Sequence, residues 1–366
     1  MTEKPIDRLL FVGPMPPPVG GYTTIAKSFV NAWQEQTGHP PELINTSPGR
    51  DKNKSGVTGI GDIVRGLRIG LEMCWKSTSA YPLLILLTVP FFQHMAPIIR
   101  FVRDKKDVPV LLWFSGGTLH EAIEGMEKKQ RDAVLQDLQQ MEKVIVETNA
   151  VQNGLRDLGL CETLVVPNPR PVSWNCLPPV HQSLNSPLRV LFFGRVIEEK
   201  GVFVLINAVR RANRQGCSVE CDIYGPIDKE IESQFKEACS RTESVKYGGI
   251  VHERVVSHIT QYDVLTLPTW FPREGHPGAI VEAMMAGIPV IVSEHMALPE
   301  IVEDGVNGRL VKPKSVADLS KVLCEFENNA TEYANYAQAH RGRLTNHDAA
   351  TAVGLIRNSM CTINKG

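Results

Sequence analysis

The sequence predicts an α/β protein with two doubly wound, Rossmann-like domains, each with a parallel sheet covered by helices. Three observations support this prediction. Near-continuous apolar strands alternate with helical patterns, a proline cluster interrupts the alternation near the middle, and each half opens with a strand that ends in glycine. Strands that are apolar on both faces are typical of parallel sheets buried between helices. The 366 residues also fit two domains of about 100–200 residues each.

The strands and helices can be placed from the apolar periodicity of the sequence. The predicted strands are Leu9–Val12, Glu42–Asn45, Leu83–Thr88, Val110–Phe114, Val144–Glu147, Leu164–Val166, Arg189–Phe193, Glu220–Tyr224, Val245–Tyr247, Asp263–Leu267 and Val290–Ser293. The predicted helices are Thr24–Trp33, Ile60–Lys76, Ala133–Met141, Val202–Asn213, Gly278–Ala286 and Val316–Phe326. Ligands of such sheets bind beyond the carboxyl ends of the strands, so we expect these edges of the two domains to face a central cleft.

A proline-rich stretch divides the chain. Prolines cluster from Pro167 to Pro171, recur at Pro178 and Pro179, and end at Pro187, where a new strand begins. Clusters of this kind mark linkers. We therefore predict a first domain over 1–170, a linker over 171–186 and a second domain over 187–345. A C-terminal helix within 346–366 is expected to pack back on the first domain.

Composition excludes several classes of function. The formal net charge is −1, which gives no indication of a nucleic-acid partner. The first residues lack the apolar core of a secretory signal, and the longest apolar run, residues 82–92, spans 11 residues. A membrane-spanning helix needs about 20. The eight cysteines contain no C-x-x-C pair, so we expect reduced, mostly buried thiols in a cytoplasmic protein.

The most informative segment contains two carboxylates eight positions apart, Glu274 and Glu282, on either side of a Pro/Gly turn. The pattern places Glu274 on a loop and Glu282 about two turns inside the helix that begins at Gly278. A helix start carries free backbone N–H groups and the positive end of the helix dipole, so it can hold a phosphate. An anion site flanked by two hydroxyl-binding carboxylates suits a sugar nucleotide.

A second motif, from Gly194 to Gly201, follows the strand that opens the second half. It places the cations Arg195 and Lys200 at the carboxyl end of the strand, where they can bind a diphosphate. The alternative is a solvated turn in which Arg195 pairs with a neighbouring glutamate. Near the start of the chain, Gly20 and Gly21 lie between a strand and a helix, where glycine allows close backbone approach to a ligand.

These motifs, in this order and spacing, resemble the retaining glycosyltransferases of family 4, which have the GT-B fold. The family's two glutamates separated by seven residues match Glu274 and Glu282. Its strand-G-R-x(4)-K-G element matches the segment Gly194–Gly201, and its Gly-Gly loop matches Gly20-Gly21. The segment Leu298–Gly308 is also similar to the family's L-P-E-I-V-x-D-G-x-N-G stretch. The resemblance is dense over about 187–315 and thinner in the first domain.

The resemblance implies a role for each matched residue. Arg195 and Lys200 would neutralise the donor diphosphate, Glu274 would lie beside the transferred sugar, and Glu282 would bind the ribose hydroxyls. The implied catalytic residues are thus Arg195, Lys200 and Glu274, and the implied donor-binding set is Gly20, Gly21, Gly194, His276, Gly278, Ala279 and Glu282. The implied co-substrate is a nucleoside diphosphate sugar, with neither a metal ion nor another cofactor, and the implied acceptor is a sugar or a lipid-linked molecule.

The sequence departs from the family at one position. Family members commonly carry a histidine after the fourth strand of the first domain, whereas Ser115 stands there in this chain. His120 follows five positions later, and we include it among the candidate catalytic residues. The alternative interpretation is that His120 caps or packs a helix.

Two further questions stay open at this level. The basic and apolar residues of Ile98–Lys106, with Arg65, Arg68 and Lys76, fit either peripheral contact with an anionic membrane or helices packed on the sheet. The preferred function is transfer of a hexose-type sugar in polysaccharide or glycolipid synthesis. A sugar-nucleotide epimerase of the same fold and a non-catalytic binding or scaffold protein are the alternatives.

Overall fold

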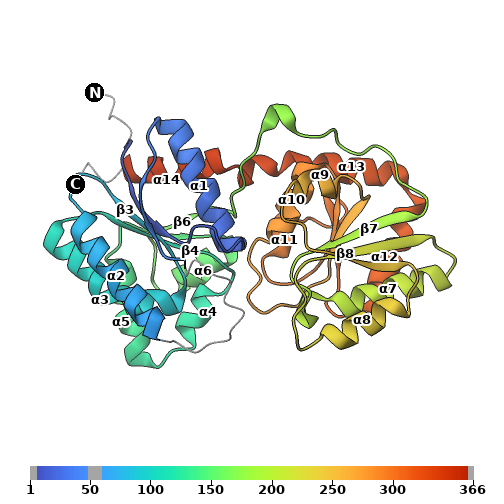
Figure 1. Ribbon diagram of the computed structural model, residues 1–366, viewed down its shortest axis with the longest axis horizontal. Helices are drawn as coiled ribbons and strands as arrows, with labels where there is room; N and C mark the ends of the chain where they lie inside the picture. Colours follow the sequence, from blue (N-terminus) through green and yellow to red (C-terminus); the bar gives the residue numbers. More distant parts are fainter. Residues whose placement is uncertain (1–5, 48–59, 362–366) are drawn as a thin grey trace. The chain divides into compact units, whose positions relative to one another are not determined.

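The computed structural model describes residues 6–47 and 60–361, which fold into two compact α/β units (Figure 1). Unit 1 consists of Met1–Pro171 and Asn346–Gly366, and unit 2 of Val172–Thr345. Residues 172–186, predicted as a linker, therefore group with unit 2. The chain leaves unit 1 and returns to it for the last helix.

Unit 1 contains a six-stranded sheet in the order β2-β1-β3-β4-β5-β6, and every neighbouring pair is parallel. Its strands are β1 Leu10–Gly13, β2 Glu42–Asn45, β3 Leu83–Leu87, β4 Val110–Phe114, β5 Lys143–Val146 and β6 Thr163–Val165. The order reverses between β1 and β3. In open parallel sheets this reversal creates the crevice in which ligands bind.

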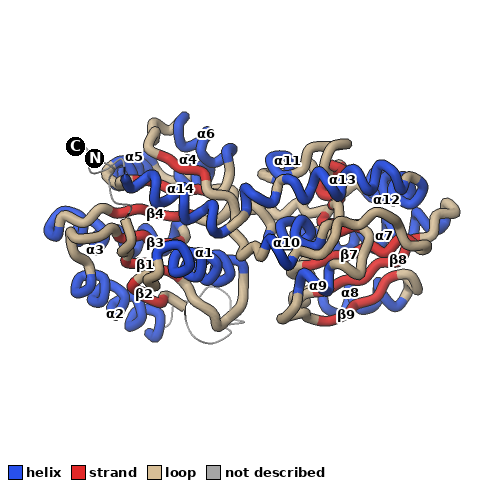
Figure 2. The backbone as a smooth tube through the Cα atoms, turned by 90° about the horizontal axis from the view of Figure 1, so that it is seen from above, coloured by secondary structure: helices blue, strands red, loops and turns tan. Residues whose placement is uncertain are grey.

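Helices cover both faces of this sheet (Figure 2). They are α1 Gly21–Thr37, α2 Ile60–Lys76, α3 Val89–Lys106, α4 Leu119–Glu124, α5 Lys128–Gln139, α6 Asn149–Asp157 and α14 Ala349–Cys361. The last helix, α14, packs against α1. Two separate cores result: Phe11 and its alternate neighbours pack with α1 and α14, whereas Leu10 and Val12 pack with the remaining helices. Burial of successive residues on opposite faces explains why the strands are apolar throughout.

Unit 2 contains a second parallel six-stranded sheet, in the order β12-β11-β10-β7-β8-β9. Its strands are β7 Leu188–Phe193, β8 Val219–Tyr224, β9 Val245–Gly249, β10 Val264–Leu267, β11 Val290–Ser293 and β12 Gly308–Val311. Read from the other edge, the strands follow the sequence order 3-2-1-4-5-6 that is typical of dinucleotide-binding domains. The switch point therefore lies between β7 and β10.

The main helices of unit 2 are α7 Val202–Arg214, α8 Glu232–Ser240, α9 Val255–Ile259, α10 Gly278–Ala286, α11 Leu298–Ile301, α12 Val316–Asn328 and α13 Ala330–Gly342. Helix α7 contacts both α8 and α12, and α10 contacts α9 and α13. The two groups lie on opposite faces of the sheet (Figure 1). The predicted fold class of two Rossmann-like α/β domains is confirmed.

Most predicted elements lie within a few residues of the observed bounds, and Ile60–Lys76 and Gly278–Ala286 are matched at both ends. The sequence analysis missed β12 and several helices, among them α13. It also began α5 five residues too late, at Ala133 instead of Lys128. Helix α5 starts with Lys128, Lys129 and Gln130, and this polar turn carries no apolar periodicity to detect.

The expectation for the cysteines was wrong. Cys217 and Cys324 form a disulfide that joins the segment before β8 to α12. Among the free cysteines of the described residues, Cys161 and Cys176 are exposed and only Cys221 is buried. The two bonded cysteines lie 107 positions apart, so no local spacing rule could have paired them. Within residues 6–47 and 60–361, no helix has the length and apolar character needed to cross a bilayer.

Candidate functional site

The candidate site of unit 2 is built by the two loops that leave the switch point. The loop after β7 contains Gly194, with φ of 150°, and ends at Gly201, with φ of 80°. A Cβ on Gly201 would lie 2.0 Å from the carbonyl oxygen of Pro268, the residue that follows β10. Only glycine allows this approach, so Gly201 fixes the β7 loop against the β10 loop.

Lys200 and Glu274 form a buried ion pair across this switch point. Lys200 Nζ lies 2.6 Å from both carboxylate oxygens of Glu274, and the side chains are only 12% and 6% exposed. The pKa of Lys200 is lowered from its usual value, chiefly because the side chain is buried. Glu274 acts in the opposite direction and raises the pKa, while the charge of Arg195 lowers it further. Two of the three ammonium N–H groups are directed at Glu274, which leaves one for another anion. The sequence assigned these residues to different parts of a ligand; in the structure they bind each other.

Thr269 holds the carboxylate of this pair in place. Its hydroxyl lies 2.8 Å from Glu274 Oε2, to which it can donate, and accepts a 3.0 Å hydrogen bond from the backbone N–H of Phe271. The side chain is fully buried. Thr269 therefore links the shape of the β10 loop to the orientation of Glu274.

Three cations surround the ring of Phe271 in the same loop. Arg195 Cζ lies 5.1 Å from the ring centroid, Lys200 Nζ 5.3 Å and Arg273 Cζ 5.7 Å. Cations within about 6 Å of an aromatic ring are attracted by its quadrupole. The attraction to the ring partly offsets the repulsion among the three cations. Three positive charges in one place can bind a diphosphate.

Helix α10 follows the same loop and begins at Gly278, directly after Pro277. The N–H of Ile280 bonds to the carbonyl of Pro277, and the amides of Gly278 and Ala279 belong to the helix start, where no intrahelical acceptor exists. Glu282 is half-buried and lies one turn into α10, not two turns as predicted.

His276 lies beside Glu274 in sequence and is 7% exposed. Its Nε2 is 4.0 Å from Glu300 Oε2 of α11. The loop therefore carries Glu274, His276 and the start of α10 at one edge of the unit 2 sheet. Their roles in catalysis and donor binding stay predictions.

The predicted residues of unit 1 lie at the corresponding edge of its own sheet. Gly20 precedes α1 with extended backbone, φ −167°, and its N–H donates to Thr23 Oγ1. Gly21 is the first residue of α1. A Cβ at either position would meet no atom within 4 Å, so the fold itself does not require glycine here.

Ser115 and His120 follow β4 at this edge. The carbonyl of Ser115 accepts a 2.6 Å hydrogen bond from the Tyr22 hydroxyl, and the Ser115 hydroxyl contacts the buried carboxylate of Glu147. The ring of His120 packs on α6, where a Cβ added to Gly154 would lie 2.3 Å from it. Its Nδ1 is buried and has no hydrogen-bond partner. This geometry agrees with the packing interpretation of His120.

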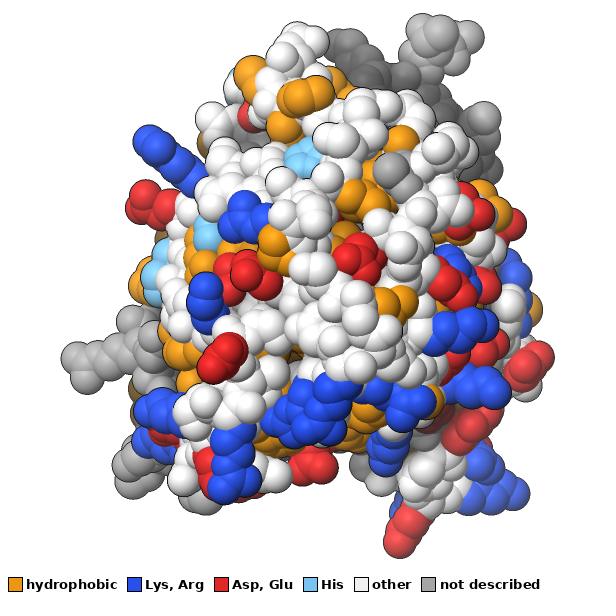
Figure 3. All heavy atoms as spheres, turned by 90° about the vertical axis from the view of Figure 1, so that its right-hand side faces the viewer, with side chains coloured by type: hydrophobic (Ala, Val, Ile, Leu, Met, Phe, Trp, Pro, Cys, Tyr) orange, Lys and Arg blue, Asp and Glu red, His pale blue; other side chains and the backbone are white. Residues whose placement is uncertain are grey.

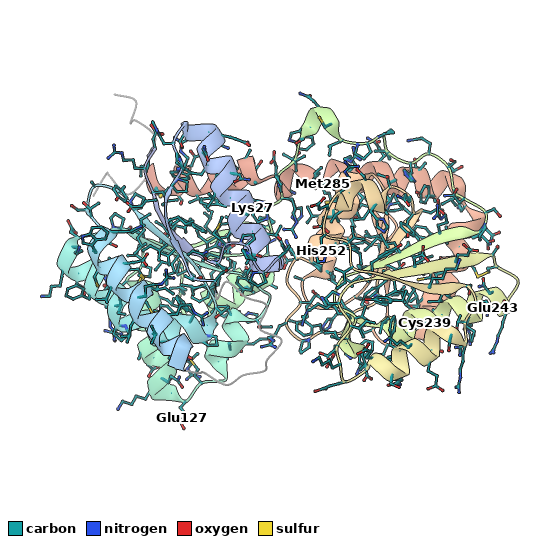
Figure 4. The ribbon with its side chains drawn as sticks, viewed as in Figure 1. Lys27, Glu127, Cys239, Glu243, His252 and Met285 are labelled. Carbon is teal, nitrogen blue, oxygen red and sulfur yellow. A yellow bond between two sulfur atoms is a disulfide. The ribbon has the colours of Figure 1, made fainter. Side chains whose placement is uncertain are left out.

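A hollow of about 550 Å³ elsewhere in unit 2 is lined by Arg210, Arg214, Arg241 and Glu243, among others. Glu243 precedes β9, so the hollow lies at the amino ends of the strands. His252 follows β9 and therefore marks the carboxyl ends. Figure 4 places these two residues at opposite ends of unit 2, and Figure 3 shows Lys and Arg side chains along the lower part of the face that it draws. The hollow contains none of the predicted site residues. We therefore place the candidate site at the carboxyl edge, where the paired charges and the helix start meet.

Sequence reasoning missed Thr269, Phe271 and Arg273. All three follow β10 within a few residues, at the carboxyl edge where ligands of parallel sheets bind, and this position was the available signal. In the part of the chain that the structure describes, no three His, Cys, Asp or Glu side chains gather as metal ligands. That the protein needs no metal ion stays a prediction.

Comparison with known proteins links unit 2 to one family. Residues 187–329 match the family described as Glycosyl transferases group 1, a range that contains the whole candidate site of unit 2. The amylovoran biosynthesis glycosyltransferase AmsK of Erwinia amylovora is 31% identical over 173 residues, which are 45% of this chain and 42% of AmsK. The MMP alpha-(1->4)-mannosyltransferase of Mycolicibacterium hassiacum is 34% identical over 151 residues, 39% of this chain and 35% of that protein.

The chain thus covers less than half the length of these curated relatives. Solved structures match this chain over nearly its whole length. Anabaena HepE in complex with UDP superposes with a TM-score of 0.71 at 17% identity, covering 97% of this chain and 100% of HepE. The apo lipopolysaccharide outer core galactosyltransferase WaaB gives a TM-score of 0.69 at 16% identity, covering 97% and 99%. The two Rossmann-like units therefore have the GT-B fold.

Proposed function

We propose that this protein is a glycosyltransferase that moves a hexose-type sugar from a nucleoside diphosphate sugar to an acceptor hydroxyl. The observation that carries the proposal is the buried Lys200–Glu274 pair at the switch point, next to the start of α10 and the cations around Phe271. This arrangement provides positive charge for a diphosphate and a fixed carboxylate for a sugar. It lies within the residues that match the group 1 glycosyl transferases.

The donor is proposed to bind with its diphosphate at the start of α10. The amides of Gly278 and Ala279, with Arg195 and the remaining N–H of Lys200, would stabilise the two phosphates as negative charge grows on them. Glu274 would face the sugar, and Glu282 would accept hydrogen bonds from the ribose. Uridine diphosphate is the first nucleotide to test, since the solved HepE complexes contain UDP and UDP-glucose.

The proposed reaction retains the configuration at the anomeric carbon. The bond between that carbon and the diphosphate oxygen breaks, the acceptor oxygen bonds to the same face, and the acceptor proton passes to the departing phosphate. Lys200 and Arg195 would stabilise the leaving group. Glu274 would stabilise positive charge at the anomeric carbon, a role for which Lys200 and Thr269 hold it in place.

Unit 1 is proposed to bind the acceptor. The same edge carries Gly20 and Gly21, which the resemblance assigns to donor binding; neither backbone conformation nor neighbouring atoms require glycine there. Polysaccharide synthesis is the proposed setting, since AmsK acts in amylovoran biosynthesis. A sugar hydroxyl, free or lipid-linked, is therefore the acceptor class to test first.

The test is release of nucleoside diphosphate from a panel of nucleotide sugars, with and without saccharide acceptors. We expect acceptor-stimulated release by the wild type and at least a roughly hundred-fold lower rate for Lys200→Ala and Glu274→Ala. The matched control is Lys236→Ala, which removes the lysine of an exposed Lys–Glu pair and should leave the rate unchanged. Product anomers identified by NMR would test retention.

A non-catalytic binding protein is the second candidate. It is favoured by Ser115 at the usual histidine position and by the packed ring of His120. Nucleotide binding measured by calorimetry without turnover across the panel would support it and would contradict the transferase proposal. Equal rates for the wild type and Lys200→Ala would contradict the proposed site.

A further inference from the structure

Helix α2 of unit 1 carries an apolar stripe that faces solvent. Val64 is 59% exposed, Leu67 61%, Leu71 72% and Trp75 81%. Large apolar side chains exposed singly are common, but a contiguous set of four on one helix indicates an interaction surface. We call these four residues the outer stripe of α2.

The spacing of the outer stripe puts its members on one side of the helix. At 3.6 residues per turn, the four positions fall within an arc of roughly 80°. The opposite side packs into unit 1, where Ile69 and Met73 are buried and Gly70 lies against Ile98 of α3. Packing on the sheet therefore accounts for the inner side of α2 and leaves the outer stripe unexplained.

Positive charge borders the outer stripe. Arg68, 52% exposed, lies next to the stripe and pairs with Glu72 at 3.3 Å. Arg65 lies further along the same flank, and Lys76, 22% exposed and 3.5 Å from Glu42 of β2, ends it. Helix α2 thus carries three cations, Arg65, Arg68 and Lys76, and two carboxylates, Asp62 and Glu72, in addition to its apolar side chains. An apolar stripe with a basic flank is the pattern of helices that lie in the interface of an anionic bilayer.

We propose that the outer stripe of α2 docks unit 1 on an anionic membrane surface. The helix would lie parallel to the bilayer, with Leu67, Leu71 and Trp75 among the lipid headgroups and acyl chains. The flanking arginines would contact lipid phosphates. Trp75 is suited to this position because its ring is largely apolar while its N–H can bond to headgroups.

A second copy of the chain is a less suitable occupant. The four side chains offer roughly 500 Å² of apolar surface, less than the about 800 Å² that each partner buries in a standard protein interface. The other basic segment, Ile98–Lys106, does not provide an equivalent surface. Its Ile99 and Val102 are buried, and Phe101 is the large apolar residue that it exposes. The charge and the shape of the stripe therefore favour a membrane.

The test is flotation of the full chain with phosphatidylcholine vesicles, with and without added phosphatidylglycerol. We expect binding that is stronger with phosphatidylglycerol and weaker in high salt. The double variant Leu71→Ser/Trp75→Ser should bind the vesicles at least roughly ten-fold more weakly than the wild type. The matched control Trp174→Ser/Leu355→Ser removes exposed apolar side chains elsewhere and should bind like the wild type.

Sedimentation and thermal unfolding complete the experiment. An unchanged unfolding midpoint would assign the lost binding of the Leu71/Trp75 variant to the surface. The proposal is overturned by a wild type that binds neither vesicle, by equal binding of wild type and variant, or by a wild-type dimer that the variant converts to monomer. Vesicle binding needs no sugar donor, so this test is independent of the transferase assay.

Discussion

At the scale of single residues, the ion pair between Lys200 and Glu274 constrains the candidate site most strongly. Both charges are buried, so each depends on the other for compensation. We predict that Lys200→Met lowers the free energy of unfolding by about 3 kcal/mol, because it leaves a buried carboxylate without its cation. Urea unfolding of the purified variant measures this loss.

The double variant Lys200→Met/Glu274→Gln provides the control for this prediction. Because it removes both charges, it should be more stable than the sum of the two single substitutions implies, by about 1–3 kcal/mol. Additive losses would show that the two side chains do not interact in solution, and the structural basis of the site would then fail.

Thr269 gives a second prediction at this scale. Thr269→Val keeps the shape of the side chain but removes the hydroxyl that contacts Glu274 and accepts from Phe271. We expect a loss of about 1–3 kcal/mol in unfolding free energy, the cost of buried polar groups without partners. The Thr269→Ser variant retains the hydroxyl and should recover most of the stability; equal losses for serine and valine would assign the effect to packing.

The sequence predicted Lys200, Glu274 and Glu282 as candidate site residues, but not that Lys200 and Glu274 bind each other. Their motifs are local, so spacing alone exposes them. The partner of Lys200 depends on β7 and β10 being neighbours in the sheet, and Thr269 matters only because the β10 loop folds back on Glu274. The Lys200–Glu274 contact joins residues 74 positions apart, and the Thr269–Glu274 contact depends on how one irregular loop bends. Neither leaves a periodic signal in one sequence.

At the scale of elements, the contact between the β7 and β10 loops depends on Gly201. We predict that Gly201→Ala destabilises unit 2 by more than about 2 kcal/mol, since φ of 80° is strained for alanine and its Cβ would overlap the Pro268 carbonyl. It should also displace Lys200 and abolish the proposed nucleotide binding. Thermal unfolding and calorimetric titration with UDP measure the two effects.

Gly216 provides a matched control for Gly201. Its φ of 93° is similar, but a Cβ there would meet no atom within 4 Å. Gly216→Ala should therefore show only the conformational cost, about 1 kcal/mol, and keep nucleotide binding. Equal effects at both positions would mean that close approach to Pro268 is unimportant.

The helices also show where sequence patterns lose information. Helix α10 is predicted at both ends because a Pro-Gly pair begins it and Gly287, in left-handed conformation, ends it. Helix α2 was predicted with equal accuracy, yet its exposed stripe was not. Apolar residues on both sides of a helix look alike in sequence, and only the packed structure distinguishes the buried Ile69 and Met73 from the exposed Leu71 and Trp75.

At the scale of the whole molecule, the disulfide between Cys217 and Cys324 gives a prediction about redox conditions. It closes a stretch with a sequence separation of 107, and restricting an unfolded loop of about 100 residues is worth up to about 4.7 kcal/mol. We expect a reducing agent, or Cys217→Ser, to lower the unfolding midpoint of unit 2. The control Cys239→Ser removes a free thiol. A midpoint unaffected by reductant would contradict the prediction.

The return of the chain to unit 1 brings a buried histidine that should make stability depend on pH. His347 is 4% exposed, and its segment is tied to unit 1 by hydrogen bonds between Arg170 and the backbone of His347 and Ala349. Burial lowers the pKa of His347 from 6.5 to about 4; the hydrogen bond with Asn168 raises it, and the charge of Arg170 lowers it. Between these two values the unfolded chain binds a proton that the folded chain does not.

Stability should therefore fall as pH drops below 6.5 and reach its full loss near the folded pKa, a total of about 3 kcal/mol. Urea unfolding of the wild type and His347→Gln across this range measures the effect. The variant has no imidazole to protonate, so its stability should fall by about 3 kcal/mol less than that of the wild type. His39→Gln, which removes an exposed histidine, should follow the wild type. Parallel curves for wild type and His347→Gln would mean that the pKa of His347 is not lowered in the folded protein, and would contradict the prediction.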